Sequence, residues 1–422
     1  MKKRLMIIGS LIEFVELIKL AKKRGYYTIV CDGYKDGPGK KYADKSYDVD
    51  IRNVNEIAEI CKKEKIDGII GSFSDIIFEQ ITQIADKANL KWYVKPKKLK
   101  YYREKDEAKK ILNEMNIKTA KFVTLRKEFK DEELRAFHFP VIVKPVNGWG
   151  SKGIYVCKNI DEIRKKIDNV TFRYNEQEIF IEEYIDFHEY NMQTWLKNGK
   201  VYVLGIADRD RNEQEGDEIK VLNRVLYPAF NIKKVYNKAS EILQKFADYT
   251  GQKDGALSMQ FFYDDINDEI IVCEIAGRFL GYEHELIKKC GGIDIEELLL
   301  DYAFDEEALN NKLENNNPFF EKYSAGLYFH GKDKMEIANM DSVYEIENLK
   351  HVDEMLLFYN VGEKIDNNSS KSYFARYYIS ADSREEIDEV TKKAFDLMNV
   401  TTKEGKSVVY KNELEYKYKN LK

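Results

Sequence analysis

Hydrophobic runs of strand length alternate with helix-length segments over the first 90 residues, and this alternation constrains the fold more than any other feature. Apolar runs at 4–9 and 26–31 are typical of buried strands, and shorter strands are predicted at 47–49 and 67–73. Helical spacing of apolar residues predicts helices over 11–21, 54–64 and 75–88. Strands that alternate with helices of this length form a parallel sheet with helices on both faces. The predicted fold class of this part is therefore α/β.

From about residue 99 the pattern changes to short strands joined by turns. A strand over 140–144, a glycine-bearing loop over 147–153 and a strand over 154–157 predict a hairpin. A second hairpin is predicted from 256–263 and 269–275. Short β runs return after residue 324, before a predicted helix over 384–398. These segments predict antiparallel sheets, so the chain as a whole is expected to be α/β and in part α+β.

Length and composition limit the class of protein. A chain of 422 residues exceeds one ordinary core, so two to four packed units are expected. The net charge is −5 and both signs are interspersed, which excludes the concentrated basic face that nucleic-acid binding requires. The five cysteines have no CxxC spacing, so neither a disulfide framework nor a zinc site is predicted.

Membrane insertion is not expected either. No uncharged run approaches the roughly 20 residues that a membrane span needs. Glu13 and Glu16 interrupt the first apolar stretch, which argues against a secretion signal. We therefore expect a soluble, cytoplasmic protein with no membrane partner.

A lysine and a glycine-bearing loop form the first motif that carries chemistry. Lys144 ends the strand over 140–144, where it offers a fixed positive charge to a polyphosphate. Glycines in the following loop allow backbone N–H groups to approach a phosphate closely. The residues of that loop with this predicted role are Gly148, Gly150, Ser151 and Gly153. Taken alone, the pattern also fits a plain hairpin with a surface lysine.

The second motif is an apolar strand that ends in carboxylates. Backbone groups of Glu183 and Ile185 are placed to read the edge of an adenine, and Glu189 to hold ribose hydroxyls. An edge strand with solvated glutamates is the alternative interpretation. The third motif places Gln260 on one strand of a hairpin and Glu274 on the other, with Arg278 after it.

Oxygen ligands suit Mg²⁺, and an arginine binds carboxylate or phosphoryl groups through two hydrogen bonds. The third motif therefore predicts a magnesium and phosphoryl site. An ordinary surface Glu–Arg pair is its alternative interpretation.

The three motifs in this order resemble the ATP-grasp superfamily of carboxylate–amine ligases. The layout is similar to biotin carboxylase and its purine-biosynthesis relatives, and the Glu-x-Ala-x-Arg form resembles bacterial L-amino-acid ligases. The resemblance implies a pre-ATP-grasp α/β domain over 1–97 and an ATP-grasp domain over 98–323, with a mobile lobe at about 110–185. A small β-rich domain would occupy 324–422.

The resemblance also implies roles for individual residues. ATP and Mg²⁺ are the implied cofactors. The residues expected to bind phosphate are Lys105, Lys144, the loop residues and Arg224. Those expected to bind the nucleoside are Glu182, Glu183, Tyr184, Ile185 and Glu189. Glu274 and Gln260 are expected to bind the metal, and Arg278 and Lys144 to act in catalysis. Glu283 and His284 either contact substrate or begin a helix.

The expected reaction follows from this resemblance. ATP phosphorylates a small-molecule carboxylate, and an amine then displaces phosphate from the acyl phosphate. An amino acid or a similar compound is the expected substrate. The sequence leaves the oligomeric state open, and the resemblance implies a homodimer as one possibility. The main alternative is a nucleotide-binding regulatory or assembly protein, because Gln260 stands where relatives carry an acidic ligand. A biotin-dependent carboxylase is disfavoured by the lack of a Met-Lys-Met segment, and a dehydrogenase by a lone Gly9 where three glycines are needed.

Overall fold

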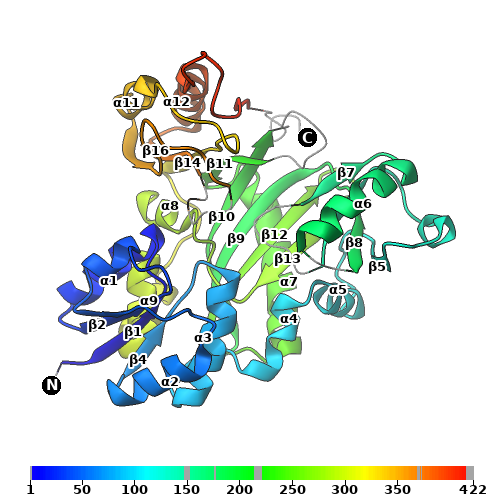
Figure 1. The fold of residues 1–422 in the computed structure, drawn as a ribbon. Coiled ribbons are helices and arrows are strands. Elements are labelled where there is room, and N and C mark those ends of the chain that lie inside the picture. Colours follow the sequence, from blue (N-terminus) through cyan, green and yellow to red (C-terminus); the bar gives the residue numbers. More distant parts are fainter. Residues whose placement is uncertain are drawn as a thin grey trace.

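The described part of the chain comprises residues 2–146, 153–174, 177–212, 221–367, 371 and 373–414 of a computed structural model. Within it, strands form three sheets, and helices pack against them (Figure 1). One sheet is parallel and the other two are antiparallel, as predicted from the change of pattern along the chain. The fold class is therefore mixed α/β and α+β.

The N-terminal sheet is parallel and has the order β3-β2-β1-β4. Its strands are β1 (Arg4–Ile8), β2 (Tyr27–Cys31), β3 (Lys45–Tyr47) and β4 (Gly68–Ile70). The helices of this region are α1 (Val15–Lys23), α2 (Val54–Lys63) and α3 (Asp75–Ala88). Their buried apolar side chains recur at helical spacing, as the sequence indicates. The carboxyl end of β4 leads directly into α3, which places Asp75 at the edge of the sheet.

Helix α9 (Ile295–Phe304) joins this N-terminal unit although it lies far along the chain. It packs against β4 and α1, and Figure 1 shows it beside β1. Side-chain atoms of Phe304 lie 2.8 Å from the position that a Cβ would take at Gly68, so the glycine permits the close approach. Arg24 and Lys312 bind the buried carboxylate of Asp301. The predicted boundary at residue 97 therefore does not separate all packing contacts.

The large sheet has the order β13-β12-β9-β10-β11-β14-β16-β15 and is antiparallel throughout. Its strands are β9 (His188–Lys197), β10 (Lys200–Asn212), β11 (Val221–Tyr227), β12 (Gly255–Asp264), β13 (Glu269–Ala276), β14 (Tyr323–Phe329), β15 (Val352–Leu357) and β16 (Ala375–Ala381). Helix α7 (Ile232–Thr250) packs against β10, β12 and β13. Because β11 pairs with β14, the sheet runs unbroken across the predicted boundary at 323/324.

The small sheet has the order β5-β8-β6-β7 and forms a lobe with its own core. Its strands are β5 (Phe122–Arg126), β6 (Val141–Pro145), β7 (Tyr155–Cys157) and β8 (Glu178–Glu183). Helix α6 (Ile160–Tyr174) contacts three of them. Val141, Val143 and Ile181 belong to this core, which is separate from the main one. A lobe with a separate core can in principle move as a unit, and the mobile lobe at about 110–185 stays a prediction.

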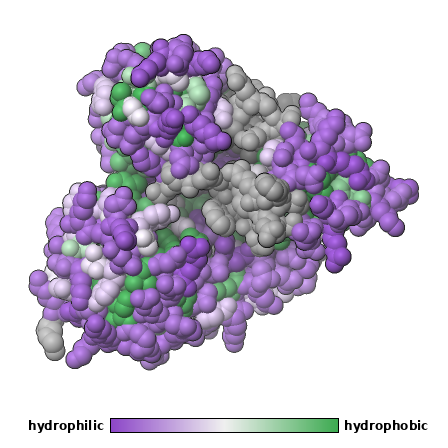
Figure 2. All heavy atoms as spheres, viewed as in Figure 1, coloured by the Kyte–Doolittle hydropathy of each residue, from purple (hydrophilic) through white to green (hydrophobic). Residues whose placement is uncertain are grey.

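The remaining elements connect and cover these sheets. They are α4 (Lys100–Arg103), α5 (Lys105–Glu114), α8 (His284–Lys289), α10 (Glu306–Glu314), α11 (Asp341–Glu347) and α12 (Arg384–Leu397), with short 3₁₀ turns η1 (Ile12–Phe14), η2 (Pro38–Lys41), η3 (Pro96–Lys98) and η4 (Asp131–Leu134). Figure 2 shows a largely hydrophilic face divided into three lobes. Among the described residues, no helix is both long enough and apolar enough to cross a membrane.

Candidate active site

A cavity of about 360 Å³ lies between the small sheet and the large sheet. Its walls come from α5, β6 and β8 on one side and from β9, β10, β12 and β13 on the other, with Asp75 contributed by the N-terminal unit. A cavity of this size between two lobes is typical of small-molecule sites. The three predicted motifs, which are far apart in the sequence, therefore meet at one place.

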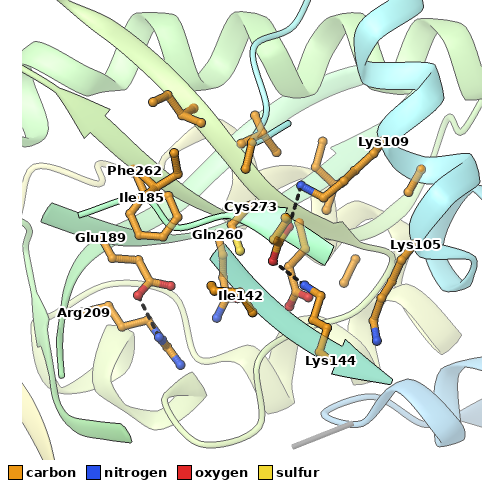
Figure 3. Close-up of a pocket in the computed structure, with 18 of the residues that line it drawn as sticks. Lys105, Lys109, Ile142, Lys144, Ile185, Glu189, Arg209, Gln260, Phe262 and Cys273 are labelled. Carbon is orange, nitrogen blue, oxygen red and sulfur yellow. Dashed lines mark hydrogen bonds and ion pairs between the residues drawn. The ribbon is translucent and has the colours of Figure 1, made fainter. Parts of the chain in front are cut away.

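Lysine side chains from two elements share one buried carboxylate at this cavity. The Nζ of Lys144 donates to Oε1 of Glu182 at 2.5 Å, and the Nζ of Lys109 lies 3.1 Å from Oε2 (Figure 3). Burial alone would raise the pKa of Glu182, but the two lysines outweigh it and lower that pKa to about 2. The cluster carries one excess positive charge, which suits an anionic ligand.

Lys105 lies at the start of α5 and faces the same cavity. Its Nζ donates to the carbonyl oxygens of Pro145 and Val146, at 3.1 and 3.0 Å. These carbonyls immediately precede the predicted phosphate loop. Lys105 and Lys144 thus reach the cavity from different segments, in the arrangement that the sequence predicts for two phosphate-binding lysines.

Arg278 holds a carboxylate from the N-terminal unit. Its Nε and Nη2 donate to the two oxygens of Asp75, at 2.7 and 2.8 Å, and Arg103 lies 3.8 Å from the same carboxylate. Burial would raise the pKa of Asp75, but the two guanidiniums lower it. Arg103 also pairs with Glu79 at 3.1 Å, so the two arginines and the two carboxylates at this end of the cavity balance in charge.

The predicted metal ligands face each other across neighbouring strands. Gln260 on β12 pairs in register with Glu274 on β13. A β-bulge follows this pair, so that Cys273 is an extra residue, and both Cys273 and Glu274 line the cavity. The Nε2 of Gln260 lies 3.3 Å from the hydroxyl of Tyr282, which leaves the amide oxygen for another partner.

Magnesium fits this pair if other ligands complete its shell. Among the described residues there is no group of three or more His, Cys, Asp or Glu side chains arranged to hold a metal. Mg²⁺ is commonly bound by one or two carboxylates together with substrate phosphates and water. One carboxylate and one amide oxygen on adjacent strands match that donor set, and they remain the predicted ligands.

A third carboxylate, Glu189, lies at the other side of the cavity. Its Oε2 accepts hydrogen bonds from Arg209, at 2.8 Å, and from Arg211 (Figure 3). Among the described residues no group donates a hydrogen bond to its buried Oε1. A fixed, unpaired acceptor at a cavity needs a donor such as a hydroxyl group. The contact of Glu189 with ribose hydroxyls stays a prediction.

Apolar side chains line the space between the charged clusters. Ile185 follows β8 at the cavity, and Phe262 faces it from β12 (Figure 3). Ile142, Ile154 and Leu112 also contribute. An apolar slot flanked by polar groups suits a flat heterocycle such as adenine. Glu183, Tyr184 and Ile185 all line the cavity, as predicted for the segment next to the base.

Part of the predicted phosphate loop lies outside the described residues. Gly148, Gly150 and Ser151 belong to that part. Gly153 is described, is buried and has a φ of +70°, a conformation that favours glycine. It is not among the residues that line the cavity. The roles of these four residues stay predictions.

The structure corrects the prediction for Arg224. This side chain is fully buried away from the cavity, and its guanidinium binds Asp210 at 2.7 Å and Asp388 at 2.8 Å. Asp388 belongs to α12, so the arginine joins β11 to the C-terminal part of the chain. An arginine enclosed by two carboxylates has a structural role, and no local sequence pattern indicates either partner.

Replacing Arg224 with methionine is expected to lower the free energy of unfolding by about 3–5 kcal/mol, because two buried carboxylates lose their cation. Urea denaturation followed by circular dichroism measures this change. Arg135→Met is the matched control, because Arg135 makes an exposed i,i+3 pair with Glu132 and should change stability by less than about 0.5 kcal/mol. Equal stabilities of the two variants would contradict the assigned role.

Glu283 and His284 prove to be buried at the start of α8 and do not line the cavity. Burial raises the pKa of Glu283 to about 7, although Asn191 and Tyr227 donate hydrogen bonds to it. Burial would lower the pKa of His284, but Glu285 and Glu296 raise it to about 9. His284 also stacks on Phe73, with ring centroids 4.1 Å apart. The helix-start interpretation therefore fits better than direct contact with substrate.

The sequence analysis missed several charged residues of the site. They are Asp75, Arg103, Lys109, Arg209 and Arg211. The position of Lys109 at the cavity could have been predicted, because it lies four residues after Lys105 and therefore on the same face of α5. Arg209 lies directly opposite Glu189 in the hairpin of β9 and β10, so the register of that hairpin was a further signal. Asp75 contacts Arg278 only through the packing of distant segments, which no local pattern records.

Comparisons with known proteins agree with this geometry. Residues 137–284 match the model of the ATP-grasp domain family. Formate-dependent phosphoribosylglycinamide formyltransferase of Prochlorococcus marinus is 28% identical over 282 residues, which cover 65% of this chain and 70% of that protein. The segment that matches the family model, residues 137–284, includes Lys144, Glu182, Gln260, Glu274 and Arg278.

Solved structures show the same fold over nearly the whole chain. The L-amino acid ligase of Bacillus licheniformis superposes with a TM-score of 0.79 at 18% identity, covering 95% of this chain and 99% of that one. The biotin carboxylase domain of 2-oxoglutarate carboxylase from Hydrogenobacter thermophilus, solved with MgADP and bicarbonate, has a TM-score of 0.73 at 16% identity, with 95% and 91% coverage. The family match shows that residues 137–284 form an ATP-grasp domain, and the solved structures share the three-part fold around it.

Proposed function

We propose that this protein is an ATP-dependent carboxylate–amine ligase. One observation carries the proposal: Lys105, Lys144 and Glu274 come from three segments and line one cavity between two sheets. The same cavity holds Arg278 and the carboxylate Glu189. A triphosphate, a divalent cation and a ribose each have complementary groups there, in the lining of the same cavity.

In the proposed reaction, a substrate carboxylate oxygen attacks the γ-phosphorus of ATP, and ADP leaves. The amine nitrogen of the second substrate then attacks the acyl carbon, inorganic phosphate leaves, and the nitrogen loses a proton. Phosphoryl transfer depends mainly on positioning and on neutralising charge. Mg²⁺ held by Glu274 and Gln260 would neutralise part of the charge on the phosphates.

Each charged residue has a separate task in this scheme. Lys105 and Lys144 orient the phosphates, and Glu274 with Gln260 would hold the cation. Arg278 stabilises charge on the acyl phosphate, for which its guanidinium has to exchange part of its contact with Asp75. The predicted loop over 147–153 would exclude water, which otherwise hydrolyses the acyl phosphate.

The substrate class is narrowed by the relatives. The formyltransferase relative is formate-dependent by name, and the ligase relative acts on L-amino acids by name. Small carboxylic acids and amino acids are therefore the first acids and amines to test. The predicted homodimer and the cytoplasmic location are part of the same proposal.

A two-dimensional screen tests this function. Purified protein, Mg-ATP, one carboxylic acid and one amine are combined, and release of ADP and phosphate is measured. We expect release that requires both an acid and an amine. Binding of Mg-ATP without turnover for any pair would instead favour the alternative of a nucleotide-binding regulatory protein, for which Gln260 in place of a carboxylate is the motivating feature. Release that needs neither acid nor amine would contradict the ligase proposal.

A further inference from the structure

Lys109 has no role in the proposed reaction, yet it contacts a residue at the centre of the site. Its side chain is 6% exposed and lies 3.1 Å from Glu182, whereas the side chain of Lys144 is 15% exposed. Both line the cavity. Two lysines therefore hold one carboxylate, although a single lysine would already neutralise it.

Lys109 is fixed in place by further contacts. Its Nζ donates to the hydroxyl of Thr119 at 2.8 Å, and that hydroxyl donates to the carbonyl of Val272 at 2.7 Å. The Nζ also lies 5.8 Å from the ring centroid of Phe122. These contacts tie α5 to β13 and hold the ammonium group close to Oε2 of Glu182.

Lys144 has a different environment. It binds the other oxygen, Oε1, at 2.5 Å, and Glu274 also acts on it electrostatically. Lys144 and the predicted metal ligand Glu274 both line the cavity, where the triphosphate is expected. To bind phosphate, Lys144 has to give up part of its contact with Glu182.

Moving the ammonium group of Lys144 away from Glu182 would cost free energy if Glu182 had no other cation beside it. A buried carboxylate that loses its only partner either takes up a proton or retains the lysine. We propose that Lys109 is a positioning residue that keeps Glu182 ionised while Lys144 moves to the phosphates of the nucleotide. This inference rests on the proposed function, because it assumes that a triphosphate enters the cavity.

The inference predicts a proton-linked defect in K109M. Without Lys109 the pKa of Glu182 rises, and it rises further when the phosphates draw Lys144 away. Binding of Mg-ATP at pH 7.5 should then weaken by about tenfold and be accompanied by additional proton uptake, up to about one proton per site. Titration calorimetry in buffers of different ionisation enthalpy measures both the affinity and the number of protons.

Matched variants separate this role from simple packing. K110M is the control, because Lys110 is exposed on the same helix and pairs with Asp106 and Glu107. We expect wild-type affinity and proton count in K110M, and a proton count close to wild type in K109R. The double variant K109M/E182Q should show no additional proton uptake, because the titrating carboxylate is gone.

The results of these experiments test the proposed function and the role of Lys109 separately. Wild-type protein that fails to bind Mg-ATP would refute the proposed function. Wild-type binding together with unchanged affinity and unchanged proton uptake in K109M would refute the role of Lys109 alone. If K109M does not fold, folding of K109M/E182Q supports the role, since the buried charge is removed. Failure of both variants to fold would assign Lys109 to packing instead.

Discussion

Replacing Lys144 with methionine is expected to reduce ATP-dependent phosphate release by at least about 10³-fold. Methionine keeps much of the side-chain volume but removes the ammonium group that faces both Glu182 and the triphosphate position. Fixed positive charge in a site that excludes water contributes this order of magnitude to transfer reactions. Glu182 would keep its contact with Lys109, so the fold should be retained. Phosphate release under saturating substrates measures the effect.

The control for this variant is Lys158→Met. Lys158 directly follows β7, is exposed and does not line the cavity. Its removal should leave the rate within about twofold of wild type, as for most surface changes. Full activity of Lys144→Met, with normal folding, would show that this lysine does not serve the transferred phosphoryl group.

Replacing Glu274 with glutamine is expected to lower the rate by about 10²-fold at a fixed magnesium concentration. The amide retains an oxygen ligand but loses the charge, and its neighbour Gln260 is already uncharged. The magnesium concentration for half-maximal rate should therefore rise. A magnesium titration of phosphate release, with ATP held constant, distinguishes weaker metal binding from a loss of catalysis.

Glu269→Gln is the matched control because it lies on the same strand, outside the cavity, and pairs with Lys118 at the surface. If the magnesium concentration for half-maximal rate in Glu274→Gln equals that of the wild type and of Glu269→Gln, Glu274 is not a ligand of the metal.

Local sequence pattern predicted the regular elements well. The helix over 75–88 has the predicted bounds, and the helix predicted over 384–398 ends at residue 397, because the apolar residues of both recur at helical spacing over several turns. The hairpin of β12 and β13 was also predicted, because a polar turn separates two runs of β-forming residues. Strands β5 and β11 were not predicted, because neither is framed by a clear turn signal.

The candidate site was only partly accessible to sequence reasoning. Residues with a motif of their own, such as Lys144 and Glu274, were found because residue type and position in a strand restrict their chemistry. Their counter-charges were not found. Asp75 reads as an ordinary helix start, and its contact with Arg278 joins residues 203 positions apart. Long-range ion pairs of this kind depend on how lobes pack, which periodicity does not encode.

The predicted domain boundaries also miss contacts between segments that are far apart in the sequence. Helix α9 follows the central hairpin in sequence but packs on the N-terminal sheet, because Gly68 leaves room for Phe304. The large sheet continues into the C-terminal part through the pairing of β11 with β14. The boundaries at residues 97 and 323 stay predictions, and the units on either side of each boundary pack against one another.

A crystal structure with Mg²⁺ and a non-hydrolysable ATP analogue tests the central claim most directly. The account predicts the base in the apolar slot near Ile185 and Phe262, the ribose at Glu189, and the triphosphate in contact with Lys105 and Lys144. Magnesium is expected on Glu274. An analogue bound elsewhere, or phosphates directed away from both lysines, would contradict the account.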